Sequence, residues 1–154
     1  MNIGIIIYSH SGHTLSVGEK IMESLLAKGH TVSLERISAA NEDPQSKEKI
    51  RLTSIPDTTP YDTVIFGAPV QGASLSPVMK EYLALLPALQ GRKAACFVTQ
   101  HFKMKWMGST RAVKQITRAA EQKGITITAS GIVQWSSEAR EDQIRQVADS
   151  LSRI

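Results

Sequence analysis

The sequence predicts a three-layer α/β sandwich in which helices cover both faces of a parallel five-stranded sheet. Strand-like and helix-like segments alternate along the chain, which is typical of a parallel sheet with helical crossovers. Segments 3–8, 63–67 and 94–99 are almost continuously apolar, as central strands covered on both faces should be. Segments 31–37 and 125–133 alternate apolar and polar side chains, so we expect them at the edges. This pattern favours the strand order 2-1-3-4-5.

The first two helices follow the first and third strands. The first has Ser16 and Glu19 at capping-box spacing and a stop at Gly29. The second has Ser76 as its cap, Pro77 at its first position, and ends before Pro87. Their expected buried faces are Val17, Ile21, Met22, Leu25 and Leu26 in the first helix, and Val78, Tyr82, Leu85 and Leu86 in the second.

Two further helices follow the fourth and fifth strands. One ends at Gly124, and the other opens with Glu138, Glu141 and Asp142 near its positive end. Their inward residues are expected to be Ala112, Val113, Ile116, Ala119 and Ala120 in one, and Ile144, Val147, Ala148 and Leu151 in the other. Segment 38–61 has a weak pattern, for which we expect a short helix or an irregular crossover.

Length and composition fit one soluble domain, covering residues 1–154. The chain is 42% hydrophobic and 21% charged, which is ordinary for a globular core. Its apolar runs are far shorter than a membrane span, and no signal-peptide core opens the sequence, so we expect a cytoplasmic protein that does not engage a membrane. Cys96, the single cysteine, lies in an apolar run and is expected to be a packed thiol.

Three loops follow the first, third and fourth strands, where doubly wound sheets bind ligands. The first, 9–14, leads into a helix and carries the hydroxyls of Ser9, Ser11 and Thr14. Gly12 lets the backbone approach a ligand closely. Unpaired N–H groups and the helix dipole favour an anion at such a turn, so we expect a phosphate there.

The other two loops supply a different environment. Loop 68–76 is rich in small residues and has no charged catalytic group, whereas loop 100–108 offers aromatic surface and positive charge. Together with the first loop they suit a flat aromatic ligand with a phosphate tail. Trp135, which follows an edge strand, is expected to serve packing.

Other functions on this winding require residues that the chain lacks. A phospho-acceptor domain needs a carboxylate at the end of its third strand, which here ends Ile65-Phe66-Gly67. A cysteine phosphatase needs a thiolate in its phosphate loop, and loop 9–14 has no cysteine. The P-loop ending and the three-glycine dinucleotide fingerprint are also missing. A mononucleotide-binding protein remains.

The chain resembles the flavodoxin family, including quinone reductases of flavodoxin-like fold, over nearly its whole length. Segment 8–14 reads YSHSGHT and is similar to the family's phosphate loop. Segment 61–70, YDTVIFGAPV, resembles its third strand and second flavin loop, followed by the helix opening SPVMK at 76–80. Segment 91–99, GRKAACFVT, is similar to the strand before the third loop.

The resemblance implies non-covalent binding of FMN. The phosphate would be held by residues 9–14, and the isoalloxazine ring bordered by residues 69–72 and 99–102. The implied cofactor-binding residues are Ser9, His10, Ser11, Gly12, His13, Thr14, Pro69, Val70, Gln71, Gly72, Thr99, Gln100, His101, Phe102 and Trp106. For His10, a capping or solvent-facing role is favoured over catalysis, and His13 is expected to contribute its backbone. Phe102 and Trp106 would either stack on the ring or close a small apolar cluster.

The charge departs from that of an electron-shuttle flavodoxin, a class that is characteristically acidic. This chain has a net charge of +4, and segment 82–120 contains no Asp or Glu. That segment carries Arg92, Lys93, Lys103, Lys105, Arg111, Lys114 and Arg118. Lys103 or Lys105 near the ring would stabilise an anionic reduced flavin. The basic face, with Arg111, would dock an acidic redox protein or the phosphates of NAD(P)H, or is simply solvated; no motif points to nucleic acid.

Three functions remain open from the sequence. The first is an FMN electron carrier that serves protein partners, favoured because the chain is short and has no clear substrate-binding insertion. The second is an enzyme that oxidises NAD(P)H and reduces a quinone or similar acceptor. The third is a binding module that has lost its flavin. A homodimer through the helix faces is compatible with each.

Overall fold

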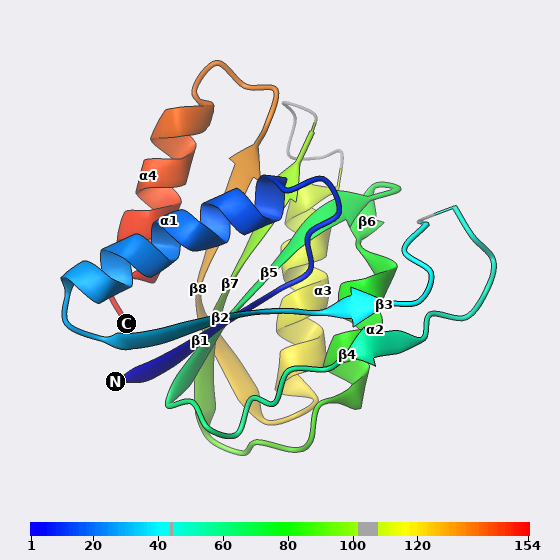
Figure 1. Ribbon diagram of the computed structural model, residues 1–154, viewed down its shortest axis with the longest axis horizontal. Coiled ribbons are helices and arrows are strands. Elements are labelled where there is room, and N and C mark those ends of the chain that lie inside the picture. Colours follow the sequence, from blue (N-terminus) through cyan, green and yellow to red (C-terminus); the bar gives the residue numbers. More distant parts are fainter. Residues whose placement is uncertain (44, 102–107) are drawn as a thin grey trace.

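The parallel sheet has the strand order expected from the sequence. The computed structural model describes residues 1–43, 45–101 and 108–154 (Figure 1). Its main sheet has the order β2-β1-β5-β7-β8, with every pair along this path parallel. These strands are β1 (Asn2–Ile7), β2 (Thr31–Arg36), β5 (Thr63–Gln71), β7 (Arg92–Gln100) and β8 (Ile125–Gln134). In chain order this is 2-1-3-4-5, so the prediction is confirmed.

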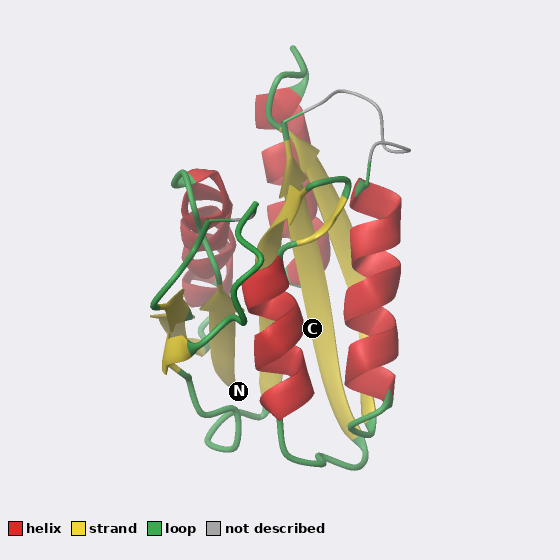
Figure 2. Ribbon diagram, turned by 90° about the vertical axis from the view of Figure 1, so that its right-hand side faces the viewer, coloured by secondary structure: helices red, strands yellow, loops and turns green. Residues whose placement is uncertain are grey.

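Two pairs of helices cover the two faces of the sheet, as Figure 2 shows. One pair is α1 (His13–Ala27) and α4 (Arg140–Leu151), and the other is α2 (Pro77–Leu85) and α3 (Ser109–Glu121). Each pair packs over its own apolar cluster: Ile5 and Ile7 of β1 face α1, whereas Ile6 joins the cluster beneath α2 and α3. Because side chains alternate along a strand, β1 contributes residues to the apolar clusters on both faces of the sheet. None of the described helices is long and apolar enough to cross a membrane.

The helix α1 begins earlier than the capping-box pattern indicates. Gly12 is its N-cap, with φ +92°, and the Oγ of Ser16 donates to the carbonyl of His13 instead of capping the helix. The expected box of Ser16 and Glu19 is therefore wrong. Leu26, expected on the buried face, is 49% exposed, because it lies at the edge of the face that holds Val17, Ile21 and Leu25.

The other helices follow the sequence more closely. Ser76 caps α2 by accepting a hydrogen bond from the N–H of Met79, and Pro77 is the first helical residue, as expected. Leu85 was expected to be buried but is 54% exposed; Leu83 takes its place in the core. Val113 and Ala119 of α3 are half-buried rather than core residues. The expected buried residues of α4 are all buried.

The crossover from β2 to β5 is irregular, one of the two outcomes that the sequence allows. It contains a short antiparallel pair, β3 (Ser38–Ala39) and β4 (Leu52–Ser54), and no helix among its described residues. Side-chain hydrogen bonds take the place of helical ones: Asn41 donates to Ser46 at 2.8 Å. Competition of such short polar side chains with the backbone explains why the weak helical pattern at 46–52 does not form a helix.

The third strand in the chain is longer than expected. It continues past Gly67 to Gln71 and turns back as β6 (Ser74–Leu75), so segment 68–76 is a hairpin rather than an open loop. Gly72 and Ala73 form its two-residue turn, both with φ +61°. Positive φ at both central residues is the geometry of a type I′ hairpin turn. Ala73 adopts a positive φ although alanine disfavours it, and the sequence lacks the Asn-Gly or Asp-Gly pair that usually predicts such a turn.

Candidate functional site at the carboxyl ends of the sheet

The start of α1 presents a row of unpaired backbone donors. The N–H of Leu15 donates to the Oγ of Ser9 at 3.2 Å, and that of Ser16 donates to the carbonyl of Gly12 at 3.0 Å. Within the described part of the chain, the N–H groups of the four preceding residues, 11–14, have no acceptor. A Cβ on Gly12 would meet nothing within 4 Å, so the turn is open on that side. The turn has the donors and the helix dipole of an anion site.

A buried hydrogen bond joins this turn to the end of β7. The hydroxyls of Thr14 and Thr99 lie 2.8 Å apart, and the two residues are 1% and 3% exposed. Both residues were expected to belong to the site, and the fold brings them together from segments far apart in the sequence. Because either hydroxyl can donate, the pair is satisfied without a ligand and fixes the start of α1 on the sheet.

The β5–β6 hairpin forms a second wall, which α3 holds in place. The Oε1 of Gln115 accepts from the N–H of Leu75 at 2.8 Å and from the hydroxyl of Ser74 at 3.0 Å. Gly108, the N-cap of α3, packs so closely that a Cβ there would lie 2.7 Å from Val70. Three of the expected site residues, Pro69, Val70 and Gln71, are half-buried at the end of β5. Gly72, also expected at the site, lies in the turn of the hairpin.

Gln100, the last residue of β7, is the most unusual polar group at this end of the sheet. The residue is 3% exposed, and both its Oε1 and its Nε2 are buried without a hydrogen-bond partner in the described structure. An unpaired buried amide costs about 1–3 kcal/mol, which folded proteins rarely leave uncompensated. Its donor and acceptor therefore suit a ligand that offers both kinds of group.

Tyr8 adds a buried hydroxyl at the end of β1 that the sequence analysis did not single out. The residue is fully buried, and its Oη makes no hydrogen bond of ordinary geometry, although Glu42 and Gln71 both approach it. Burial, followed by the Glu42 carboxylate, raises the pKa of this phenol. Because Tyr8 continues an apolar strand, its pattern indicates only a core residue.

An aromatic stack borders the start of α1. The imidazole of His13 lies on the indole of Trp135 with ring centroids 3.9 Å apart and planes 10° from parallel. The guanidinium of Arg140 also lies over the indole, 4.7 Å from its centroid. Burial, and then the charges of Arg140 and His101, lower the pKa of His13. Trp135 serves packing, as expected, but it packs on a predicted site residue.

The remaining expected site residues are only partly described. Ser9 is buried, whereas His10, Ser11 and His101 are exposed. The carbonyl of His101 accepts a hydrogen bond from the N–H of Ser136 at 3.1 Å. Phe102, Lys103, Lys105 and Trp106 lie outside the described residues.

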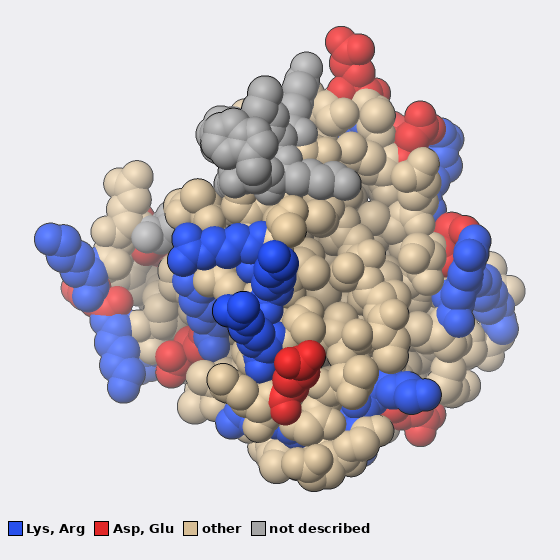
Figure 3. Space-filling model, turned by 180° about the vertical axis from the view of Figure 1, so that it is seen from behind, with Lys and Arg blue, Asp and Glu red and all other residues tan. Residues whose placement is uncertain are grey.

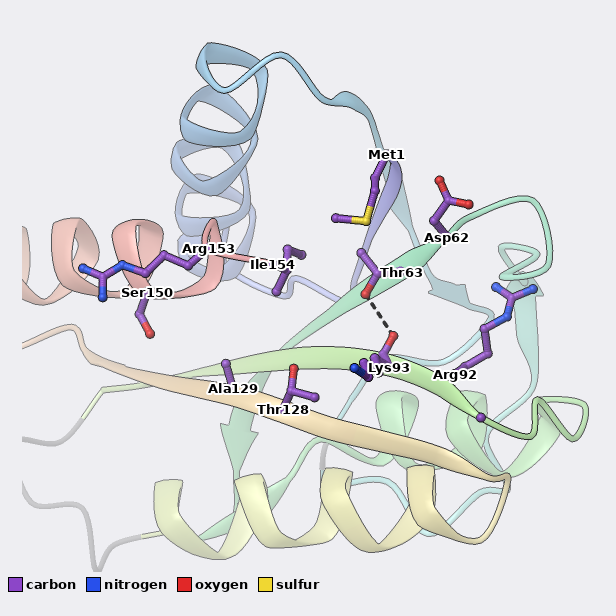
Figure 4. A pocket seen from close by; sticks show the side chains of 11 residues that line it. Met1, Asp62, Thr63, Arg92, Lys93, Thr128, Ala129, Ser150, Arg153 and Ile154 are labelled. Atoms are coloured by element: carbon purple, nitrogen blue, oxygen red, sulfur yellow. Dashed lines mark hydrogen bonds between the residues drawn. The ribbon is translucent and has the colours of Figure 1, made fainter.

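Two hollows on the described surface lie away from these residues. One of about 680 Å³ opens at the amino ends of β5 and β7, where Asp62, Lys93 and Arg153 line it (Figure 4). Another, of about 720 Å³, lies between the crossover and α2, beside Arg51 and Glu81. Neither is lined by any residue of the predicted site.

Solved structures share this architecture. No protein-family model matches the sequence, and no curated protein matches it significantly. The two-electron reduced flavodoxin of Megasphaera elsdenii is 21% identical with a TM-score of 0.71, the match covering 99% of each chain. Oxidised flavodoxin 2 of Bacillus cereus is 18% identical with a TM-score of 0.69, covering 99% of this chain and 98% of its own. A WrbA-like flavodoxin of Agrobacterium tumefaciens is 17% identical with a TM-score of 0.66, covering 99% and 97%. The chain has the flavodoxin-like fold.

Proposed function

We propose that the protein binds FMN at the carboxyl ends of β1, β5 and β7 and transfers electrons through it. The observation that carries this proposal is that two sets of unsatisfied polar groups occur at the same end of the sheet. Within the described residues, the N–H groups of 11–14 at the start of α1 are unpaired, and so is the amide of Gln100 at the end of β7. The hydrogen bond between Thr14 and Thr99 holds these two elements together. A phosphate suits the first feature, and a ring with both donors and acceptors suits the second.

The residues present fit this cofactor. The N–H groups at the start of α1 would hold the phosphate, with the hydroxyl of exposed Ser11 beside them. The half-buried hairpin segment 69–71 would border one side of the ring, and the amide of Gln100 would bond to its polar edge. When bound, FMN would supply the redox chemistry, whereas the chain binds, orients and excludes water.

The form of the function that we favour is an electron carrier. Two of the similar structures are flavodoxins, and the match covers 98% and 99% of their own lengths. The fold is also compatible with an NAD(P)H-dependent oxidoreductase acting on quinones, and the reaction of the FMN-loaded protein with NADPH and a quinone separates the two.

The experiment begins with titration of the purified protein with FMN, followed by fluorescence quenching, with riboflavin as the ligand that lacks the phosphate. We expect FMN to bind at least about tenfold more tightly than riboflavin, because only FMN engages the N–H groups at the start of α1. Equal affinity would contradict the phosphate site. Failure of both to bind would favour a module without flavin.

The FMN-loaded protein is then mixed with NADPH and a quinone. If the protein is a carrier, the visible absorbance of its bound flavin should bleach slowly or not at all under these conditions. Steady turnover without a partner protein would instead establish the oxidoreductase.

A further inference from the structure

Four exposed cations gather on the outer surface of α2 and α3. Figure 3 shows Lys and Arg side chains clustered over these two helices. We call the cluster formed by Lys80, Arg111, Lys114 and Arg118 the α2–α3 basic face. The last three lie at positions i, i+3 and i+7 of α3, so they share one side of the helix over about 10 Å. The cations therefore form a continuous stripe rather than a scatter of single charges.

The described structure gives these cations no ion-pair partner. No carboxylate of the described residues lies within ion-pair distance of any of the four. The opposite face differs. Lys20 of α1 pairs with Glu23, Arg145 of α4 pairs with Asp142, and Arg153, two residues beyond α4, pairs with Asp149. The environment of Lys80 is also unfavourable for a positive charge, because burial and then the charge of Arg111 lower its pKa. An approaching anionic surface would relieve this repulsion.

The shape of this face favours a protein over a small anion. None of the four cations lines either of the hollows described above, and three of them lie along a straight helix. A free phosphate group needs converging donors, whereas a flat row of cations fits a surface with a row of carboxylates. Of the exposed large apolar side chains of the described residues, only Leu85 belongs to α2 and none belongs to α3, and a single such side chain is too little for insertion into a membrane.

The face also begins beside the site. Arg111 lies in the first turn of α3, and the N-cap of that helix, Gly108, packs on Val70 and Ala73 of the hairpin wall. We propose that the α2–α3 basic face docks an acidic redox protein that exchanges electrons with the site. The inference rests on the proposed function, because a partner here is useful only when the neighbouring site carries a flavin.

A charge-steered contact suits such an exchange. Electron-transfer complexes are small and short-lived, so their rates depend on encounter more than on buried area. A row of cations raises the encounter rate with a partner of opposite sign, and salt weakens this effect. The net charge of +4 adds to the same steering.

The test uses the FMN-loaded protein and, as electron donor, a reduced [2Fe–2S] ferredoxin chosen for its strong negative charge. Each ferredoxin loses one electron, so two ferredoxins reduce one FMN, with protons taken from solvent. The variant R111Q/K114Q/R118Q removes three cations of the basic face. The matched control K20Q/R145Q/R153Q removes three from the opposite face, where exposed ion pairs contribute little to stability.

At an ionic strength of about 20 mM, we expect the second-order rate of flavin reduction to fall about tenfold in the basic-face variant and less than about twofold in the control. The salt dependence of the rate should flatten only in the former. Photoreduction by a neutral deazaflavin should proceed equally in both, since it needs no docking. Equal losses in the two variants would overturn the proposal, because they would show an effect of net charge alone.

Binding of the oxidised ferredoxin to the flavin-free protein, measured by calorimetry, keeps this inference distinct from the proposed function. If FMN does not bind but the ferredoxin binds through the three cations, the proposed function fails and the acidic-protein surface stands. Binding to vesicles that contain phosphatidylserine and binding to duplex DNA are measured separately as the alternatives. Tight binding to either at physiological salt, lost in the basic-face variant, would overturn the choice of an acidic protein.

Discussion

The two ends of the parallel sheet offer a ligand very different surroundings. At the amino ends a cavity of about 680 Å³ opens, and two of the polar side chains along it, Asp62 and Thr63, already have partners. The hydroxyl of Thr63 donates to the carbonyl of Lys93 at 2.9 Å (Figure 4). The carboxylate of Asp62 accepts from the N–H of Asn2 at 2.7 Å. A ligand placed there would compete with hydrogen bonds that the fold has already made.

At the carboxyl ends, polar groups of the described residues are unpaired. The N–H groups of residues 11–14 and the amide of Gln100 lack partners in the part of the chain that the structure describes. Unpaired polar groups raise the free energy of the folded protein, and a ligand that pairs them recovers this cost. The comparison teaches that the two ends differ in whether their polar groups already have partners, and the unpaired groups mark the carboxyl ends as the candidate site.

The largest expected effect comes from placing a negative charge at each end. Ser11→Glu puts a carboxylate beside the N–H groups at the start of α1, and like charges should weaken FMN binding about 100-fold. Ser150→Glu puts the same group at the amino-end cavity, where exposed Ser150 contributes to the lining. We expect this variant to change the FMN dissociation constant less than about twofold. Riboflavin affinity should be nearly unchanged in both, and the reverse ranking of the two variants would reassign the site.

A second, smaller effect should follow from removal of the unpaired amide. Gln100→Leu replaces a buried donor and acceptor by an apolar group of similar size, so the flavin-free protein should gain about 1–2 kcal/mol of stability. FMN affinity should fall about tenfold, because the ring loses its hydrogen bonds. Chemical denaturation without FMN and FMN titration measure the two changes.

The control for this variant is a glutamine whose amide is paired. Gln143 accepts a hydrogen bond from the N–H of Gln134 at 2.8 Å through its Oε1. Gln143→Leu should therefore lower the stability of the flavin-free protein. If Gln100→Leu also lowered it, the amide would have a structural partner and the comparison between the two ends would break.

The smallest expected effect concerns the pH dependence of stability. The pKa of His13 is lowered in the folded protein, chiefly by burial and then by Arg140, so the unfolded chain binds the proton more readily. As the pH falls through the ordinary histidine range, from about 7.5 to 5.5, this difference should reduce the free energy of unfolding. His13→Gln should flatten that part of the stability profile in the flavin-free protein. An unchanged slope would show that His13 titrates as it does in the unfolded chain.

The strand order could be predicted because burial on both faces appears directly in the residue pattern. The runs around Ile5, Ile65 and Cys96 are apolar without interruption, and all three residues are fully buried. The turn after β1 was recognisable for a similar reason, since hydroxyls and glycine between a strand and a helix mark a local anion site. Such signals depend only on neighbouring residues.

The rest depends on contacts between distant segments or on signals that mislead. The stack of His13 on Trp135 and the unpaired amide of Gln100 exist only once the strands are assembled. The start of α1 was misplaced because Gly12 caps it without a side chain, whereas Ser16 imitates a cap three residues into the helix. The hairpin after β5 was missed because Ala73 adopts a positive φ that its residue type disfavours.

The single thiol gives the sheet a built-in chemical reporter. Cys96 is fully buried in β7, between β5 and β8, and burial raises its pKa to about 12. A thiol reagent can therefore reach it only when the central strands separate. The labelling rate of the native protein then measures the population of globally opened molecules, and its decrease on adding a ligand measures the binding energy of that ligand.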